Sequence, residues 1–268
     1  IQWKSTIVPH GARVELNADG QLRQIAQYRF GLLEGDSKTF FPNGKLETSS
    51  QYLHGVLNGV SQAFFANEQL KEELHYYNGQ IDGDYVQYYE NGAKALLFPH
   101  EEGKLHGVSC EWFPSGVLKF QRRFVQGVLH GDGKNPAVIA YDESRNIVEV
   151  VDFRQGVPFG MHIRYHKNGQ EAYRVAYKNG KEEGKKQFFS ESGSLLGEGS
   201  FAEGVPYGTH WRNYPDGQPA YLAKFDEEGN LLAPILEYHQ NGNKLREYQF
   251  VKEKLDGSYF EWYPDGSL

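Results

Sequence analysis

Residues 31–55 read GLLEGDSKTFFPNGKLETSSQYLHG, and this stretch holds every feature that repeats along the chain of 268 residues. Glycine stands at its start and again four residues later, which gives a Gly-x-x-x-Gly corner. The segment FFPNG at residues 40–44 follows, with the Asn-Gly signal of a tight turn. Short segments of β-branched and aromatic residues between such signals are typical of strands. The stretch therefore predicts one unit of strand, tight turn, strand and corner.

The same spacing recurs along almost the whole chain. Three columns of glycine, mostly 24 residues apart from unit to unit, hold 28 of the 31 glycines. The turn column consists of Gly20, Gly44, Glu68, Gly92, Gly116, Arg145, Gly169, Gly193, Gly217, Gly242 and Gly266. Glu68, Arg145, Ala233 and Glu253 replace glycine in these columns, so the local turn geometry there stays open. A fixed period of this length indicates a repeat architecture, in which each unit packs against its neighbours.

The predicted fold is all-β. We expect an elongated, single-layer antiparallel β-meander of about eleven β-hairpin repeats of 24 residues, because short strands joined by tight turns pair with their neighbours in sequence. The array should cover residues 11–268, after a lead-in strand at residues 1–10 and with a five-residue insert within residues 131–145. Asn-Gly and Asp-Gly should supply the positive φ angles of the turns, with proline setting the approach.

Two aromatic columns lie side by side just before the turns. The first is aromatic in nine of eleven units, and the second is aromatic chiefly in the N-terminal units, at Phe41, Phe65, Tyr89 and Phe113. Adjacent strand residues point to opposite faces, so both columns cannot serve one core. We predict that the first column is core and that these four residues form an apolar stripe that binds a partner. The alternative is that a curved sheet or residues 1–10 cover the stripe.

These motifs resemble a known repeat family. The Gly-x-x-x-Gly corners, the aromatic pairs and the turns YYENG (residues 88–92) and FFPNGKL (residues 40–46) are similar to MORN (membrane occupation and recognition nexus) repeats, and more closely to their bacterial variant form. The resemblance implies an elongated sheet used for protein–protein contact and sometimes for lipid contact. Many bacterial variant-MORN proteins are labelled antitoxin-like. The family has no shared catalytic residues, so the resemblance transfers none to this chain.

Charge and composition narrow the class of partner. The chain has 28 Lys and Arg against 35 Asp and Glu, a net charge of −7 without a basic cluster, which excludes a typical nucleic-acid footprint and disfavours anionic membranes. We therefore predict a non-catalytic scaffold that binds a protein partner through an aromatic-rich face. Lipid binding and glycan binding stay open as alternatives, the latter because rows of Trp and Tyr can stack on sugar rings. An unrecognised enzyme site at the insert is the weakest hypothesis.

Individual chemical motifs favour structural roles. His106 and His130 each precede a corner glycine and provide two metal ligands where zinc usually has three or four, so we interpret them as corner residues. Cys110 occupies an apolar strand position, which favours a packed thiol over a nucleophile. Residues 131–135, GDGKN, lack the spacing of a phosphate loop. We predict no cofactor and no metal site.

The sequence also gives expectations about the ends of the chain and about its cellular compartment. The chain begins at Ile1 and its single methionine is Met161, so we expect a processed or trimmed start. A single cysteine fits both a cytoplasmic protein and an exported or cell-envelope protein whose signal has been removed. The last unit stops at Leu268 before its second strand, so we expect either a following segment or edge-to-edge self-association with another copy.

Overall fold

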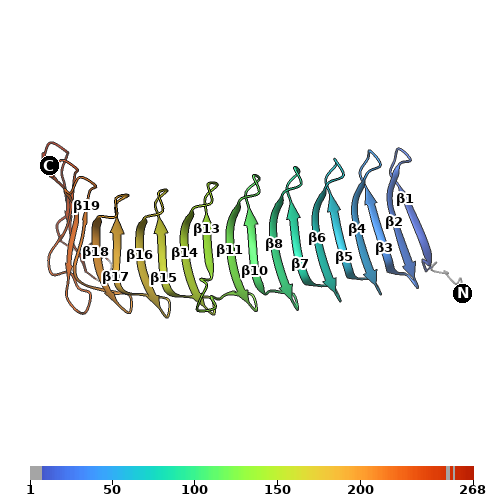
Figure 1. Ribbon diagram of the computed structural model, residues 1–268, viewed down its shortest axis with the longest axis horizontal. Helices are drawn as coiled ribbons and strands as arrows, with labels where there is room; N and C mark the ends of the chain where they lie inside the picture. Colours follow the sequence, from blue (N-terminus) through green and yellow to red (C-terminus); the bar gives the residue numbers. More distant parts are fainter. Residues whose placement is uncertain (1–7, 252–253, 256) are drawn as a thin grey trace, which may run out of the picture. The chain divides into compact units, whose positions relative to one another are not determined.

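The computed structural model describes residues 8–251, 254–255 and 257–268 (Figure 1). These residues form 25 β-strands and no helix, and 23 of the strands are assigned to one open antiparallel sheet in meander order. The predicted all-β meander of hairpins is therefore confirmed. The chain divides into two units: residues 1–128 with 143–145, and residues 129–142 with 146–268. We call them unit 1 and unit 2 and describe each by itself.

Unit 1 contains five hairpins. Their strands are β1 (Gly11–Leu16), β2 (Leu22–Arg29), β3 (Leu32–Phe40), β4 (Leu46–Leu53), β5 (Val56–Phe64), β6 (Leu70–Tyr77), β7 (Gln80–Tyr88), β8 (Lys94–Glu101), β9 (Lys104–Leu105), β10 (Gly107–Trp112) and β11 (Leu118–Val125). The short β12 (Val128–Leu129) lies where the chain divides. The first strand begins at Gly11, and most of the lead-in strand proposed at residues 1–10 lies outside the described residues.

Unit 2 continues the same pattern. Its strands are β13 (Val138–Tyr141), β14 (Ile147–Arg154), β15 (Val157–Tyr165), β16 (Glu171–Lys178), β17 (Lys181–Phe189), β18 (Leu195–Ala202), β19 (Val205–Asn213), β20 (Pro219–Phe225), β21 (Ile235–Tyr238), β22 (Lys244–Tyr248) and β25 (Phe260–Glu261). The strands β23 (Phe250–Val251) and β24 (Lys254–Leu255) form a separate two-stranded sheet. Glu253, one of the departures from the glycine columns, lies outside the described residues.

Each hairpin closes through a turn with one left-handed residue. The Phe41 N–H donates to the Lys45 carbonyl at 2.8 Å, the Gly44 N–H donates to the Phe41 carbonyl at 2.8 Å, and Gly44 has a φ of 82°. Asn43 does not have a positive φ, so our prediction for the residue before the glycine was wrong. Its Oδ1 instead accepts the Lys45 N–H at 3.0 Å. This is a type I turn followed by a left-handed glycine, in which the asparagine stabilises the turn by its side chain.

The two non-glycine residues of the turn column keep this geometry. Glu68 has a φ of 70° and Arg145 a φ of 69°, close to the 82° of Gly44. The left-handed conformation costs a non-glycine residue on the order of 1–2 kcal/mol. Glycine avoids this cost but loses more entropy on folding. The substitutions in the glycine column therefore strain the turn without changing it.

Replacing Glu68 with glycine is expected to stabilise unit 1 by about 1 kcal/mol, because the strain at φ 70° disappears. The exposed Lys45–Glu68 ion pair that is lost contributes little. The urea midpoint of unfolding measures the effect. Glu90→Gly is the matched control: Glu90 is outside the left-handed region, so glycine should lower the midpoint there. Equal shifts in both variants would contradict the strain argument.

The corners between hairpins use a different turn. His54 and Gly55 both have positive φ, 51° and 85°, which is the two-residue type I′ turn that matches strand twist. The Gly55 N–H donates to the Leu33 carbonyl at 2.8 Å, and Gly79 bonds to the Leu57 carbonyl in the same way. Each of these carbonyls belongs to the preceding corner. At these type I′ corners, a backbone hydrogen bond therefore links each repeat to the repeat before it.

A row of small or buried side chains forms the centre of one face of the sheet. We call this the front face; cross-strand pairing places Ala26, Ser37 and Ser109 on it in unit 1, and Val175, His210 and Ala223 on it in unit 2. These six are among the twelve buried residues of the described chain. Larger side chains flank the row, for example Tyr52 opposite Leu57. The core is thus a central strip of a single layer.

Ser109 is a weak point of this strip. The residue is 1% exposed, and its hydroxyl oxygen has no hydrogen-bond partner within the described part of the chain. A buried hydroxyl without a partner costs about 1–3 kcal/mol. Ser109→Ala is therefore expected to raise the free energy of unfolding of unit 1 by about 1 kcal/mol. Denaturant unfolding measures it, with Ser61→Ala as the control, because the Ser61 hydroxyl is bonded to Ser50 at 2.8 Å and its loss should destabilise.

Candidate functional site

The predicted stripe lies at the turn ends of the hairpins. Phe41, Phe65, Tyr89 and Phe113 are all half-buried, and none is among the strongly exposed apolar residues. The Tyr89 hydroxyl donates to the Trp112 carbonyl of the next repeat at 2.7 Å. In unit 2, Tyr214 donates to the Tyr238 carbonyl at 2.7 Å from the equivalent position. This column therefore joins neighbouring repeats, and its role in partner binding remains a prediction.

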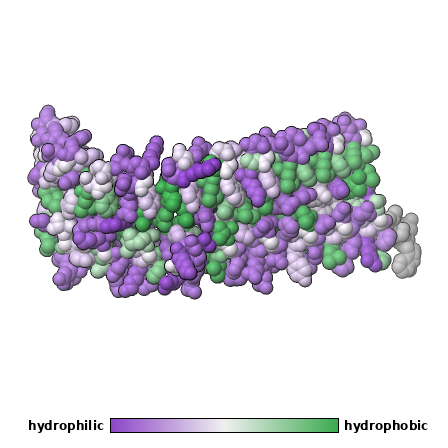
Figure 2. All heavy atoms as spheres, viewed as in Figure 1, coloured by the Kyte–Doolittle hydropathy of each residue, from purple (hydrophilic) through white to green (hydrophobic). Residues whose placement is uncertain are grey.

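The most exposed apolar side chains of unit 1 lie elsewhere. Phe30 is 74% exposed and Tyr77 is 63% exposed, and both belong to or flank corner turns. Figure 2 also shows hydrophobic residues across the N-terminal hairpins, beneath their hydrophilic turns. The aromatic rings that flank the central strip of the front face, Tyr28, Tyr52 and Tyr76, are half-buried. Unit 1 thus presents a front face that is partly open along its aromatic row.

The two histidines that precede corner glycines each lie close to a polar group of the corner. The His130 Nδ1 accepts the Gln155 N–H at 3.1 Å, just as the Glu34 carboxylate accepts the His54 N–H at 2.8 Å. His106 is 3.2 Å from the Glu101 carboxylate. Within the described residues, no group of three His, Cys, Asp or Glu side chains is placed to hold a metal ion.

Cys110 and the insert also have local structural roles. Cys110 is half-buried on β10, and burial raises the pKa of its thiol. In the insert, the Asp132 carboxylate accepts the N–H groups of Lys134 at 2.9 Å and Asn135 at 2.7 Å. Those backbone donors are occupied by the chain's own carboxylate. The loop therefore does not offer them to a phosphate.

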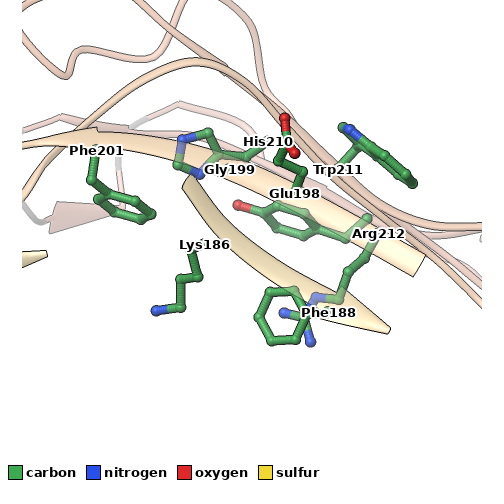
Figure 3. Close-up of a pocket in the computed structure, with 9 residues that line it drawn as sticks. Lys186, Phe188, Glu198, Gly199, Phe201, His210, Trp211 and Arg212 are labelled. Atoms are coloured by element: carbon green, nitrogen blue, oxygen red, sulfur yellow. The ribbon is translucent and has the colours of Figure 1, made fainter. Parts of the chain in front are cut away.

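A hollow of about 220 Å³ opens on the front face of unit 2 (Figure 3). Strands β17 to β20 supply its walls, with the side chains of Lys186, Phe188, Phe201, His210, Arg212 and Tyr221. Figure 3 shows Glu198 and Trp211 pointing away from Lys186 and Phe188, and these two residues pair with each other on the opposite face. The hollow therefore combines aromatic and cationic side chains from neighbouring repeats.

Two glycines of β18 lie in this region, and one of them, Gly199, lines the hollow. Gly197 and Gly199 lie on the front face of β18, where they pair with Phe188 and Lys186 of β17. A Cβ atom on Gly199 would come 2.6 Å from the His210 Nδ1, and one on Gly197 would collide with the Arg212 side chain. Glycine inside a strand often marks close approach of another group. Sequence analysis missed this signal, although both are among the three glycines outside the repeat columns.

Arg212 is electrostatically distinct on this face. Of the four cationic side chains on the front face of β14 to β22, Arg164 bonds to Glu149 at 2.8 Å, Lys186 to Glu182 at 2.6 Å, and Arg246 lies 3.4 Å from Glu261. Arg212 has no carboxylate partner among the described residues. Its guanidinium carbon lies 4.8 Å from the Phe188 ring centroid and 5.9 Å from that of Tyr221. The aromatic rings hold the guanidinium without neutralising it.

His210 forms the inner wall of the hollow. It is 9% exposed, and its ring lies between Phe201, at 5.0 Å between centroids, and Phe225, at 4.9 Å. The His210 Nε2 is 2.9 Å from the Ser200 carbonyl oxygen. Burial lowers the pKa of His210 despite this contact. The imidazole is therefore neutral at pH 7 and presents an aromatic surface rather than a charge.

The stability of unit 2 should consequently fall as the pH decreases below about 6.5, the ordinary pKa of histidine. Because the pKa of His210 is lower in the folded than in the unfolded chain, the unfolded chain binds the proton first, and protonation favours unfolding. Urea midpoints measured between about pH 7.5 and 5.5 test this. His210→Phe should flatten the profile. An unchanged slope in the variant would assign the pH dependence to other groups.

A comparison with known protein families identifies two of the repeats. Residues 33–54 and 57–78 match the model of the MORN repeat variant. Two repeats, in β3 to β6 of unit 1, thus match the MORN repeat variant, and the same turns and corners recur in unit 2. No curated protein matches the sequence.

Among solved structures, one match is a chain of the crystal structure of TcdB2-TccC3-Cdc42. The identity is 9% and the TM-score 0.19, over 88% of this chain and 16% of that chain. The present chain thus spans about a sixth of the length of that chain. The structural similarity is too low to carry an argument. In the described residues, no helix is long and apolar enough to cross a membrane.

Proposed function

We propose that this chain is a non-catalytic scaffold that binds a protein partner through the front face of its repeat sheet. The observation that carries the proposal is the single layer: within the described residues no second layer packs on the front face, although that face carries a half-buried aromatic side chain in nearly every repeat. In unit 1 these are Tyr28, Tyr52, Tyr76 and Phe124, and in unit 2 they are Phe153, Tyr177, Phe201 and Phe225. Partly exposed rings in register are typical of protein interfaces.

The stripe of the second aromatic column borders this face. The Lys119 Nζ lies 5.5 Å from the Phe113 ring centroid and 5.6 Å from that of Phe120, and Phe120 pairs with Glu111 on the front face. Phe41, Phe65 and Tyr89 hold the same position in their repeats. We include these four residues in the proposed surface as its turn-side margin. The MORN family is generally non-enzymatic, which supports binding as the function.

Affinity capture from extracts of the source cell tests the proposal. The intact chain is compared with Phe65→Ser/Phe113→Ser, and captured proteins are identified by mass spectrometry. We expect a protein that the intact chain retains and the variant loses, with an unchanged far-ultraviolet circular dichroism spectrum. A second variant, Phe30→Ser/Tyr77→Ser, changes exposed corner residues and should retain the partner.

Two results would contradict the proposal. Loss of the dichroism spectrum in Phe65→Ser/Phe113→Ser would mean that these rings are needed for folding. Capture of the same proteins by all variants, or of none by the intact chain, would remove the front face as the interface. Co-sedimentation with anionic vesicles and binding to a glycan array address the lipid and glycan alternatives directly.

A further inference from the structure

We infer that the hollow on β17 to β20 of unit 2 binds an acidic segment of the protein partner: an apolar side chain enters the hollow and a neighbouring carboxylate pairs with Arg212. The inference rests on the proposed scaffold function and names the partner's chemistry at one site. It follows from the shape of the hollow, from the free charge at its rim and from the neutral histidine in its wall.

The shape comes from missing side chains. Gly197 and Gly199 place no side chain on the front face of β18, so the Arg212 and His210 side chains of β19 lie close over its backbone. Phe188, Phe201 and His210 surround the resulting space of about 220 Å³. Because burial lowers the pKa of His210, the imidazole part of the wall is neutral and aromatic at pH 7. An apolar side chain of a partner therefore finds aromatic contacts with Phe188, Phe201 and His210 there.

The charge comes from Arg212. Its guanidinium carbon lies over the rings of Phe188 and Tyr221, at 4.8 Å and 5.9 Å from their centroids, which is within the range of cation–π stacking. Stacking of this kind leaves the N–H groups at the edge available, and these donors match the two oxygens of a carboxylate. The other three cations of the face already have carboxylate partners. Arg212 is thus a partly fixed, uncompensated donor beside an apolar hollow.

The number of unpaired cations at the hollow favours a carboxylate over a phosphate as the acidic group of the partner. A phosphate monoester carries about −1.5 to −2 charges at neutral pH, and clusters of several cations usually bind it. The hollow offers the single free charge of Arg212, because Lys186 is bonded to Glu182 at 2.6 Å. One guanidinium neutralises one carboxylate. In a chain with a net charge of −7, a dianion would remain uncompensated.

A selection of short displayed random peptides against the intact chain tests the inference. The enriched peptides should share an aspartate or glutamate next to an apolar residue. Their affinity should fall about tenfold on Arg212→Gln, which corresponds to the loss of a charged hydrogen-bonded pair. Arg212→Lys should lose part of this affinity, because lysine keeps the charge but not the two-donor edge. Arg164→Gln is the matched control and should bind as the intact chain, since Arg164 already pairs with Glu149.

Several outcomes would overturn the inference. These are no enrichment, enrichment without acidic residues, equal binding by Arg212→Gln, or full binding by Arg212→Lys. Inorganic phosphate that competes more strongly than acetate at equal ionic strength would replace the carboxylate by a phosphate. Amide NMR spectra check that each variant is folded. A partner captured equally by the intact chain and by Arg212→Gln would overturn the acidic-segment site while leaving the scaffold function intact.

Discussion

Replacing Gly197 with alanine is expected to lower the free energy of unfolding of unit 2 by about 3 kcal/mol. The added Cβ would come 2.7 Å from the Trp211 carbonyl oxygen and 3.1 Å from the Arg212 Cα, which are backbone atoms of the paired strand β19. A flexible side chain could move aside, but the backbone of β19 can move only if its pairing with β18 is disturbed. The substitution should therefore separate the two strands locally.

Hydrogen exchange of the β18 and β19 amides, read together with the urea midpoint, measures this effect. Gly217→Ala is the matched control. Gly217 has a φ of 88° and open space around its Cβ position, so alanine there should cost only about 1 kcal/mol of backbone strain. If both variants lose the same stability, the close approach at Gly197 is not what requires glycine. Repeat arrays can unfold in stages, which is why a readout for each hairpin is needed.

Val175→Asp should have a similarly large effect, a loss of about 3–5 kcal/mol in unit 2. Val175 is 0% exposed in the central strip of the front face, opposite His162. A carboxylate at this position loses its hydration. The cationic side chain on the neighbouring strand β17, Lys186, is already bonded to Glu182. The added charge is therefore poorly compensated, and the strip has no second layer that could rearrange around it.

Thermal and urea unfolding of the variant test this prediction. Val157→Asp makes the same chemical change at a corner residue that is 43% exposed, and it should change stability by less than about 0.5 kcal/mol. A stability loss of the same size at both positions would mean that added negative charge in general, rather than burial, destabilises the unit. A loss at neither position would mean that the central strip is not the core.

The repeat pattern predicted the strands, the hairpin turns and the meander order, because the signals involved are local. It failed where backbone geometry departs from regular alternation. In β3 and β4, Thr39 pairs with Thr48 but Phe40 pairs with Leu46, so Glu47 is an extra residue in a bulge. A bulge re-aims the side chains beside it, which a strict two-residue period does not anticipate. Phe41 follows this bulge and, like its equivalents, is half-buried, whereas its role in partner binding stays a prediction.

The hollow of unit 2 could not be predicted from the period either. Its walls come from four strands, and a repeat pattern describes what the units share rather than what distinguishes one of them. The available signal was an exception to the pattern: Gly197 and Gly199 interrupt a strand at positions where other repeats carry side chains. The free charge of Arg212 depends on which carboxylates reach which cations. That requires side-chain positions that no spacing rule supplies.

The hydrogen bond from a corner glycine such as Gly55 to the corner before it also bears on how such a chain changes over evolution. Gly55 depends on Leu33 and Gly79 on Leu57, the same 22-residue step in each case. Duplication or loss of one complete repeat restores this step on both sides of the junction. A partial duplication leaves one corner amide without its carbonyl. Selection can therefore adjust the copy number of repeats in whole units, and the length of the binding face with it.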